Sequence, residues 1–288
     1  MKLPTLRLRH EPIQPTRDFA MKHAAHLAVL ALAGAALSPV NAAEAYASWD
    51  NFTGAVEINP VRWQFMDRIL RVEGGALRML QRDLGGQSNN TGVFHSSLSS
   101  NLKNPQLITQ MRAAVTVNNF GVTGCAANPN GSSVQARLLG SGFFNAGPGL
   151  PTSRVNDVGA TLRLVRSSTS IDAPGLLRVH GTVFQCTTPE CNGGDISLGS
   201  IDLGTAAIGE TVVLKMEWEP AFKRFNFYRG ANPVMRVTYT ADDSLAGFLP
   251  FRGVGNRTSM ATCLSGNRTD GFMDAKFDTV SVNASAAP

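Results

Sequence analysis

The sequence predicts an all-β protein built as a two-sheet antiparallel sandwich of the jelly-roll type. Apolar and polar residues alternate with a period of two in several segments. Short clusters rich in Gly, Pro, Asn and Ser separate these segments. After residue 45 there is no convincing helical period of useful length. Many short strands joined by such turns are typical of sandwiches and barrels.

The alternating segments define the expected strands. In 211–219, Val212 and Leu214 share one face, while Lys215 and Glu217 share the other. Successive side chains of a strand point to opposite faces, so this pattern indicates one buried and one solvated face. The same reasoning predicts strands at 110–117, 134–138, 160–166, 176–185, 224–229, 233–240 and 272–282.

The clusters between the strands have the composition of turns. They lie at 84–91, 127–133, 145–152, 192–194 and 252–257. We interpret the serine-rich run around His95 as a polar loop. In the final strand the apolar positions change parity after Asp278, which predicts a β-bulge there.

Residues 21–45 have the organisation of a secretory signal peptide. A basic start at Lys22 precedes an uncharged run from Leu27 to Leu37, and a small-residue cleavage site ends at Ala45. The apolar run is shorter than the roughly 20 residues that a membrane span needs. We therefore expect an exported protein, periplasmic or extracellular, from a bacterium.

Residues 1–20 precede this signal and carry charges that a signal peptide lacks. We expect them to be a disordered extension, or to lie upstream of the true start at Met21. Residues 46–288 show no internal repeat and no break in composition, so they are expected to form a single β-sandwich domain.

The four cysteines all follow the signal, and an even number of cysteines in an exported chain favours disulfides. Cys186 and Cys191 flank a turn-like segment and are expected to pair locally. That leaves Cys125 to pair with Cys263. A zinc site is the alternative, but it would need a different spacing and a nearby histidine.

Charge and hydropathy exclude two classes of partner. The chain carries a formal net charge of +5, and the five basic and three acidic residues of 1–45 leave the remainder at +3. That balance gives no basic footprint for nucleic acid. No later apolar run is long enough to be a transmembrane segment. A glycan or a surface protein remains as the expected partner.

Several short motifs carry a resemblance to a known family. They are Asp50-Asn51-Phe52, Trp63, the segment 74–79 (GGALRM), the segments 213–218 (VLKMEW) and 225–230 (FNFYRG), and the closing strand 277–282 (FDTVSV). Together they resemble the concanavalin A-like lectin/glucanase superfamily, which includes laminin-G-like modules. The resemblance implies a jelly-roll sandwich that serves as a lectin, a glycosidase, an adhesion module or a structural domain.

The resemblance also implies two kinds of site. Laminin-G-like and lectin domains often bind calcium, for which Asp270, Asp274 and Asp278 are candidate ligands because Ca²⁺ prefers oxygen donors. The related glucanases carry a Glu-x-Asp-x-Glu strand that this sequence lacks. Its nearest substitute is Glu217 and Glu219, whose Cα atoms would lie about 6.6 Å apart on a strand. Two such glutamates are also what a solvated strand face contains.

Sugar binding needs an aromatic platform and a few polar groups on an exposed surface. The loop at 141–148 and the loop at 248–252 both offer aromatic residues, although aromatics in such loops also serve as core plugs. A sheet face that carries Arg163, Arg178, His180 and Glu217 would be a third surface if those strands are neighbours and the face is concave. A surface histidine is the simpler interpretation of His180. The candidate ligand-binding residues are Phe143, Phe144, Asn145, Phe251, Arg178 and His180.

These observations favour an exported, lectin-like module that binds carbohydrate or a cell-surface glycoconjugate without catalysis. No cofactor is expected apart from a structural calcium ion. The first alternative is a structural or adhesive module of the envelope that binds protein. The second is a glycoside hydrolase or lyase that uses Glu217 or Glu219.

Overall fold

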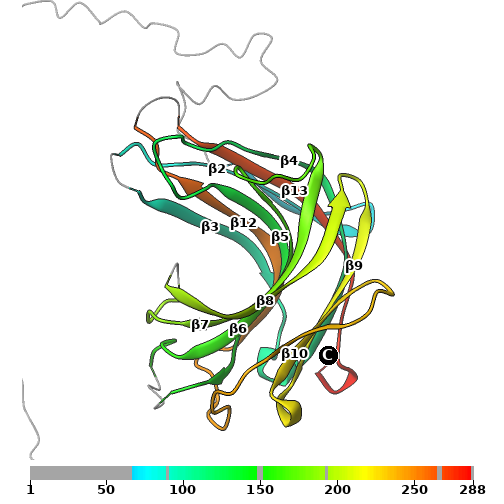
Figure 1. The fold of residues 1–288 in the computed structure, drawn as a ribbon. Coiled ribbons are helices and arrows are strands. Elements are labelled where there is room, and N and C mark those ends of the chain that lie inside the picture. The colour runs from blue at the N-terminus through cyan, green and yellow to red at the C-terminus, as the bar shows by residue number, and fades with distance from the viewer. Residues whose placement is uncertain (1–66, 89–90, 148–151, 192–193, 265–267, 287–288) are drawn as a thin grey trace, which may run out of the picture. The chain divides into compact units, whose positions relative to one another are not determined.

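The computed structural model describes residues 67–88, 91–147, 152–191, 194–264 and 268–286. Within these ranges the chain forms two antiparallel sheets that pack on each other (Figure 1). The predicted two-sheet antiparallel jelly-roll sandwich is therefore confirmed. The extension, the signal and the motifs at 50–52 and Trp63 lie outside the described residues.

One sheet has seven strands among the described residues. In spatial order they are β1 (Asp67–Glu73), β2 (Ala76–Leu84), β13 (Asp270–Val282), β4 (Gln110–Val122), β9 (Thr211–Glu219), β10 (Arg224–Arg229) and β11 (Met235–Thr238). Two motifs distant in sequence are neighbours here, because Leu77 on β2 pairs with Phe277 on β13.

The other sheet has six strands in the described part of the chain. In spatial order they are β3 (Val93–Asn101), β12 (Phe251–Ala261), β5 (Ser133–Asn145), β6 (Asp157–Ser167), β7 (Leu176–Cys186) and β8 (Asp195–Ala207). The strands are long, and the sheet is visibly curved (Figure 1). This sheet carries the candidate site.

The core lies between the sheets and follows the alternation seen in the sequence. On β9, Val212 and Leu214 are buried. On β5, Val134, Ala136 and Leu138 are fully buried and belong to the same cluster. The strands that pack on the core thus send mainly alternate side chains inward, and most of the remaining side chains form the outer faces of the sandwich.

Three segments interpreted as loops or turns are strands in the structure. The run around His95 is β3, the cluster at 252–257 belongs to β12, and residues 141–145 end β5. In β12, Gly253 and Gly255 pair with both neighbouring strands. A Cβ atom built on Gly255 would lie 2.4 Å from the backbone oxygen of Leu98. Glycine here permits close packing of β3 instead of marking a turn.

The predicted β-bulge in the last strand is confirmed. The register of β13 with β4 shifts between Asp278 and Ser281, and Thr279 has a positive φ of 52°. The extra residues account for the change of parity after Asp278.

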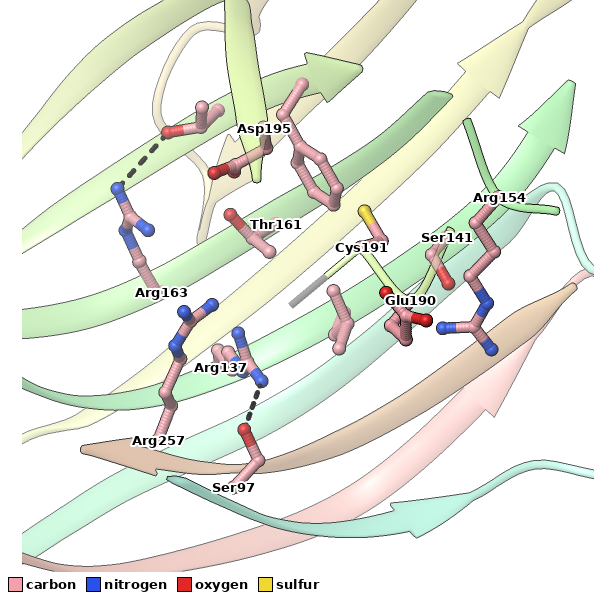
Figure 2. Close-up of a pocket in the computed structure, with 13 residues that line it drawn as sticks. Ser97, Arg137, Ser141, Arg154, Thr161, Arg163, Glu190, Cys191, Asp195 and Arg257 are labelled. Carbon is pink, nitrogen blue, oxygen red and sulfur yellow. Dashed lines mark hydrogen bonds between the residues drawn. The ribbon is translucent and has the colours of Figure 1, made fainter. Parts of the chain in front are cut away.

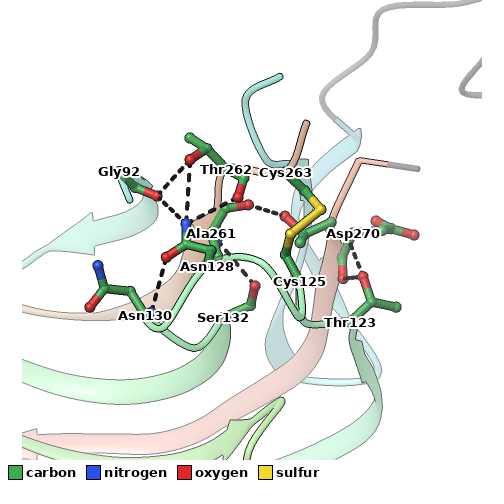
Figure 3. The surroundings of a disulfide bond; sticks show 11 residues. Gly92, Thr123, Cys125, Asn128, Asn130, Ser132, Ala261, Thr262, Cys263 and Asp270 are labelled. Atoms are coloured by element: carbon green, nitrogen blue, oxygen red, sulfur yellow. Dashed lines mark hydrogen bonds between the residues drawn. A yellow bond between two sulfur atoms is a disulfide. The ribbon is translucent and has the colours of Figure 1, made fainter. Parts of the chain in front are cut away.

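Both predicted disulfides are present. Cys186 and Cys191 close a five-residue separation, and Cys125 and Cys263 close one of 138 residues. Figure 3 shows the second bond, which joins the segment after β4 to the segment after β12 and therefore ties the two sheets together. The buried Asn128 amide supports the same corner by donating hydrogen bonds to the backbone oxygens of Gly92 and Thr262.

The helices among the described residues are single 3-10 turns, and none of them is long and apolar enough to cross a membrane.

Candidate functional site

The face of the six-stranded sheet that points away from the core carries aligned polar side chains. One register row runs across the strands through Gly255, Arg137, Arg163 and His180. The next row runs through Gly253, Leu139, Thr161 and Thr182. Each row has a glycine at its β12 position, so no β12 side chain stands directly opposite Arg137 or Leu139.

A pocket of about 260 Å³ lies on this face (Figure 2). Its size is just below the range of roughly 300–1,000 Å³ that is usual for small-molecule sites. The residues that line it are Ser97, Arg137, Leu139, Ser141, Arg154, Thr161, Arg163, Thr182, Phe184, Glu190, Cys191, Asp195 and Arg257. Most are hydrogen-bonding side chains of neighbouring strands, with Leu139 and Phe184 as apolar exceptions.

Phe184 gives the pocket an aromatic wall. Its ring lies over Gly159, where an added Cβ atom would be 2.4 Å from ring atom Cζ and 2.9 Å from the backbone oxygen of Gly140. The ring occupies this position because residue 159 has no side chain. A half-buried ring beside polar groups can stack on the CH groups of a sugar while the polar groups bind its hydroxyls.

Three arginines form a cluster on the pocket floor. Arg137 is only 5% exposed, and its Nη2 donates to Ser97 Oγ at 3.0 Å. Nη2 of Arg163 donates to Nδ1 of His180 at 3.2 Å and to Oγ1 of Thr182 at 3.3 Å. The Nε atoms of Arg137, Arg163 and Arg257 are buried without a hydrogen-bond partner. Figure 2 shows the three side chains beside one another.

Burial and mutual repulsion shape the charges of this cluster. Burial, together with the positive charges of Arg257 and Arg163, lowers the pKa of Arg137 to about 9. Burial likewise lowers the pKa of Arg163 to about 10, while Asp195 opposes that shift. Burial also lowers the pKa of Arg257, again against Asp195. All three remain cationic near neutral pH.

The rim of the pocket comes from loops and strand ends. Glu190 and Cys191 belong to the loop closed by the Cys186–Cys191 disulfide. Arg154 precedes β6, and the exposed Asp195 begins β8. The lining thus contains four arginines and two carboxylates, and it is cationic at neutral pH.

The structure brings together part of the predicted third surface. Arg163, Arg178 and His180 lie on the same outer face of the six-stranded sheet, and His180 contacts Arg163. Glu217 lies in the other sheet, so the predicted grouping is wrong for that residue. Arg178 lies outside the pocket and binds the carboxylates of Asp172 and Asp202.

The predicted aromatic loops have mainly structural positions. Phe143 and Phe144 are 7% and 1% exposed and pack against Trp218, which is the core-plug role considered for them. Asn145 is buried and donates to Asp157 Oδ1 at 2.9 Å. Phe251 is half-buried at the start of β12. None of the four lines the pocket.

Glu217 and Glu219 lie on β9 in the seven-stranded sheet. Glu217 accepts hydrogen bonds from Gln110 Nε2 at 2.6 Å and from the Tyr228 hydroxyl at 2.8 Å. Glu219 pairs with Arg224, and this hydrogen bond lowers the pKa of Glu219. A lowered pKa keeps a carboxyl ionised, whereas a general acid for glycoside cleavage needs a raised one.

Two of the three candidate calcium ligands form ion pairs with arginines. Asp270 pairs with Arg82 through both carboxylate oxygens at 3.0 and 2.5 Å. Asp274 pairs with Arg78 at 3.0 and 2.8 Å, and Asp278 is exposed on the bulge. In the part of the chain that the structure describes, no group of three or more His, Cys, Asp or Glu side chains is placed to hold a metal ion.

Several pocket residues were not among the sequence candidates. Arg137 and Thr161 alternate with core residues on predicted strands. A polar residue at such a position is what an ordinary solvated strand face contains, so neither stood out as a site residue. Arg257 lies in a cluster interpreted as a turn. Phe184 did offer a signal: it shares parity with Arg178 and His180, so it is an aromatic residue on the polar face of a predicted strand.

Comparison with known proteins gives only weak similarities to solved structures. No family model and no curated protein matches the chain significantly. Among solved structures, it is similar to the carbohydrate-binding module CBM66 from Bacillus subtilis, with 11% identity, a TM-score of 0.30, and coverage of 75% of this chain and 90% of that chain.

Two other solved structures show similarity of the same order. The catalytic domain of an endo-1,3-beta-glucanase (laminarinase) from Thermotoga petrophila has 11% identity and a TM-score of 0.33, with 74% of this chain and 79% of that chain covered. The exoplasmic/lumenal domain of VIP36, in its Ca²⁺/Man3GlcNAc-bound form, has 10% identity and a TM-score of 0.31, with 76% and 84% covered. Similarity at this level does not define a family for the chain.

Proposed function

We propose that this protein is an exported binding module that holds a carbohydrate in the pocket on the outer face of the six-stranded sheet. The observation that carries the proposal is the position of Phe184 beside several hydrogen-bonding side chains of neighbouring strands. A sugar ring presents CH groups to an aromatic face and hydroxyls to donors and acceptors, so it needs both features together.

The polar partners suit hydroxyl recognition. Thr161, Thr182 and Ser141 supply groups that both donate and accept, and the Oγ1 atom of Thr161 is buried without a hydrogen-bond partner within the protein. A buried hydroxyl without a partner is unfavourable, so a ligand that binds it gains affinity. Both disulfides support the exported location, because such bonds persist in oxidising compartments.

A glycan array probed with the purified, disulfide-bonded protein tests the proposal, with calcium and again with a chelator. We expect a specific glycan hit that Phe184→Ala weakens by about tenfold or more, since burying a Phe side chain against a ligand contributes roughly 1.5–3 kcal/mol. Phe222→Ala is the matched control because Phe222 is 64% exposed and lies outside the pocket. If the chelator weakens glycan binding, calcium takes part in that binding.

A blank array with folded protein would contradict the proposal. The structural or adhesive role with a protein partner would then be favoured, and pull-downs from the envelope would follow. If Phe184→Ala and Phe222→Ala both bind the glycan as strongly as the unchanged protein, the carbohydrate site lies elsewhere than in this pocket.

A further inference from the structure

The three arginines of the pocket floor differ from five ion-paired, partly buried arginines of the described chain, and from Arg166, Arg252 and Arg268, which donate to backbone oxygens. Arg78, Arg82, Arg178, Arg224 and Arg229 each form an ion pair with a carboxylate. The three arginines of the pocket floor have no carboxylate within ion-pair distance among the described residues, and each has a buried Nε without a partner. The cluster therefore carries positive charge that no direct ion pair neutralises.

The register places these charges against one another. Arg137 on β5 is directly opposite Arg163 on β6. Arg257 on β12 pairs with Gln135, two residues before Arg137, and so lies diagonal to it on the same face. Like charges on directly opposed strand positions destabilise a sheet. Burial increases that cost because water screens the charges less.

A buried polar group without a partner lowers stability unless something else binds it. The pocket lies beside the cluster, and the β12 residue directly opposite Arg137 is Gly255, which has no side chain. A guanidinium offers a planar fork of N–H donors that matches the oxygens of a carboxylate or a sulfate. Three such forks on one floor favour an anionic ligand over a neutral one.

We infer that Arg137, Arg163 and Arg257 form a subsite for an anionic group of the bound sugar, either a carboxylate or a sulfate ester. The inference rests on the proposed carbohydrate function and specifies its ligand class: uronate-containing or sulfated glycans. The anionic group lies on the arginine floor, and the sugar ring lies against Phe184.

The acidic residues of the lining do not fill this role. Asp195 is exposed and acts on Arg163 and Arg257 from beyond ion-pair distance, and Glu190 is exposed on the disulfide loop. They limit the net charge of the pocket and leave the buried Nε atoms without partners. They also disfavour a ligand with many anionic groups at the rim, so one anionic group per bound sugar residue fits best.

Isothermal titration calorimetry with matched ligands tests the inference. A short oligogalacturonate is compared with its methyl ester, which keeps the same ring but lacks the charge, and a sulfated oligosaccharide is compared with its desulfated form. We expect at least one acidic ligand to bind about tenfold or more tightly than its neutral counterpart. Binding should weaken as NaCl is raised, and the preferred pair distinguishes carboxylate from sulfate.

Substitutions of the arginines test whether the cluster causes the preference for acidic ligands. Arg257→Gln should weaken the acidic ligand by about 10- to 100-fold, which is the loss expected for a charge-assisted contact. Arg178→Gln removes the same charge from the same sheet face outside the pocket and should change affinity less than about twofold. Arg163→Gln serves as a second variant if Arg257→Gln does not fold, as judged by circular dichroism and thermal unfolding.

The outcomes separate the inference from the proposed function. If neutral glycans bind as tightly as acidic ones, or if Arg257→Gln and Arg178→Gln behave alike, the anionic subsite is overturned while carbohydrate binding stands. If no glycan binds but inorganic sulfate binds in an Arg257-dependent manner, the arginines recognise anions and the carbohydrate function is overturned. If nothing binds, both are wrong.

Discussion

At the residue scale, Arg252 and Arg137 show that a buried arginine can either stabilise the fold or remain with few partners. Arg252 is 2% exposed and donates to the backbone oxygens of Ile108, Ser141 and Phe251, and its guanidinium lies 3.4 Å from the centre of the Phe143 ring. Its donors satisfy carbonyls that would otherwise be buried without partners. Arg137 is buried to a similar degree but has few partners, so its charge lowers stability until a ligand binds it.

This contrast predicts opposite effects of the same substitution. Arg137→Met should raise the free energy of unfolding of the ligand-free protein by about 1 kcal/mol or more, because it removes a buried charge without an ionic partner. Arg252→Met should lower it by about 1–3 kcal/mol, because it leaves buried carbonyls without donors. Urea unfolding of both variants checks this. A clear loss of stability in Arg137→Met would contradict the anion-site argument.

The histidines of the outer face predict a stability that falls below neutral pH. Burial and then the charge of Arg163 lower the pKa of His180 below its ordinary value of 6.5. Burial and then Arg257 do the same for His95. The unfolded chain therefore binds more protons in the window between the folded pKa and 6.5, so stability is lost as pH falls through that window.

Urea midpoints at pH 7.5 and 5.5 measure this effect. We expect a lower midpoint at pH 5.5, and a smaller difference between the two pH values in the double variant His95→Gln, His180→Gln. Asp202 and Arg178 also face His180, the first raising and the second lowering its pKa, and the double variant leaves both in place. An unchanged difference in that variant would assign the pH dependence to other groups.

At the scale of elements, the strands with clear alternation could be predicted, and the strands that complete the pocket could not. β4, β6, β7, β9 and β10 alternate apolar and polar residues and were located by that pattern. β3 contains four serines, and β12 contains Gly253, Gly255 and Asn256, so both segments have the composition of loops. Their strand state comes from pairing with distant segments, which a local pattern does not contain.

For the same reason, only part of the candidate site could be predicted from the sequence. Arg163 and His180 could be placed on one polar face, but Arg257 could not join them until the place of β12 in the sheet was known. The charge of a single arginine in a strand is ordinary, and only the sheet order shows that three of them meet. Burial of Phe143 and Phe144 likewise depends on a register shift within β5 that follows Gly140.

Gly159 provides a test of how β6 and β7 support the aromatic wall. In Gly159→Ala, the new Cβ atom would lie 2.4 Å from the Phe184 ring and 2.9 Å from the backbone oxygen of Gly140. We expect the ring to move, glycan binding to weaken as in Phe184→Ala, and stability to fall by about 1–3 kcal/mol. Gly131→Ala is the control, because its nearest neighbours would be at 3.3 Å in an exposed turn. Tight binding by Gly159→Ala would exclude Phe184 as the platform.

At the scale of the described sandwich, the two disulfides have different consequences. Cys125–Cys263 links residues 138 positions apart and joins the two sheets. In the chain-entropy model such a loop contributes about 5 kcal/mol, compared with about 2 kcal/mol for the five-residue separation of Cys186–Cys191. The short loop instead carries Glu190 and Cys191 into the pocket lining.

Removing each bond should therefore separate stability from binding. Cys125→Ser, Cys263→Ser is expected to lower the free energy of unfolding by about 2–5 kcal/mol and to leave the affinity of the folded protein unchanged. Cys186→Ser, Cys191→Ser is expected to cost less stability and to weaken glycan binding several-fold, because the rim of the pocket loses its constraint. Urea unfolding and calorimetry on both double variants give the two quantities. The reverse pattern would show that the short loop supports the fold and that the pocket rim does not contribute to recognition.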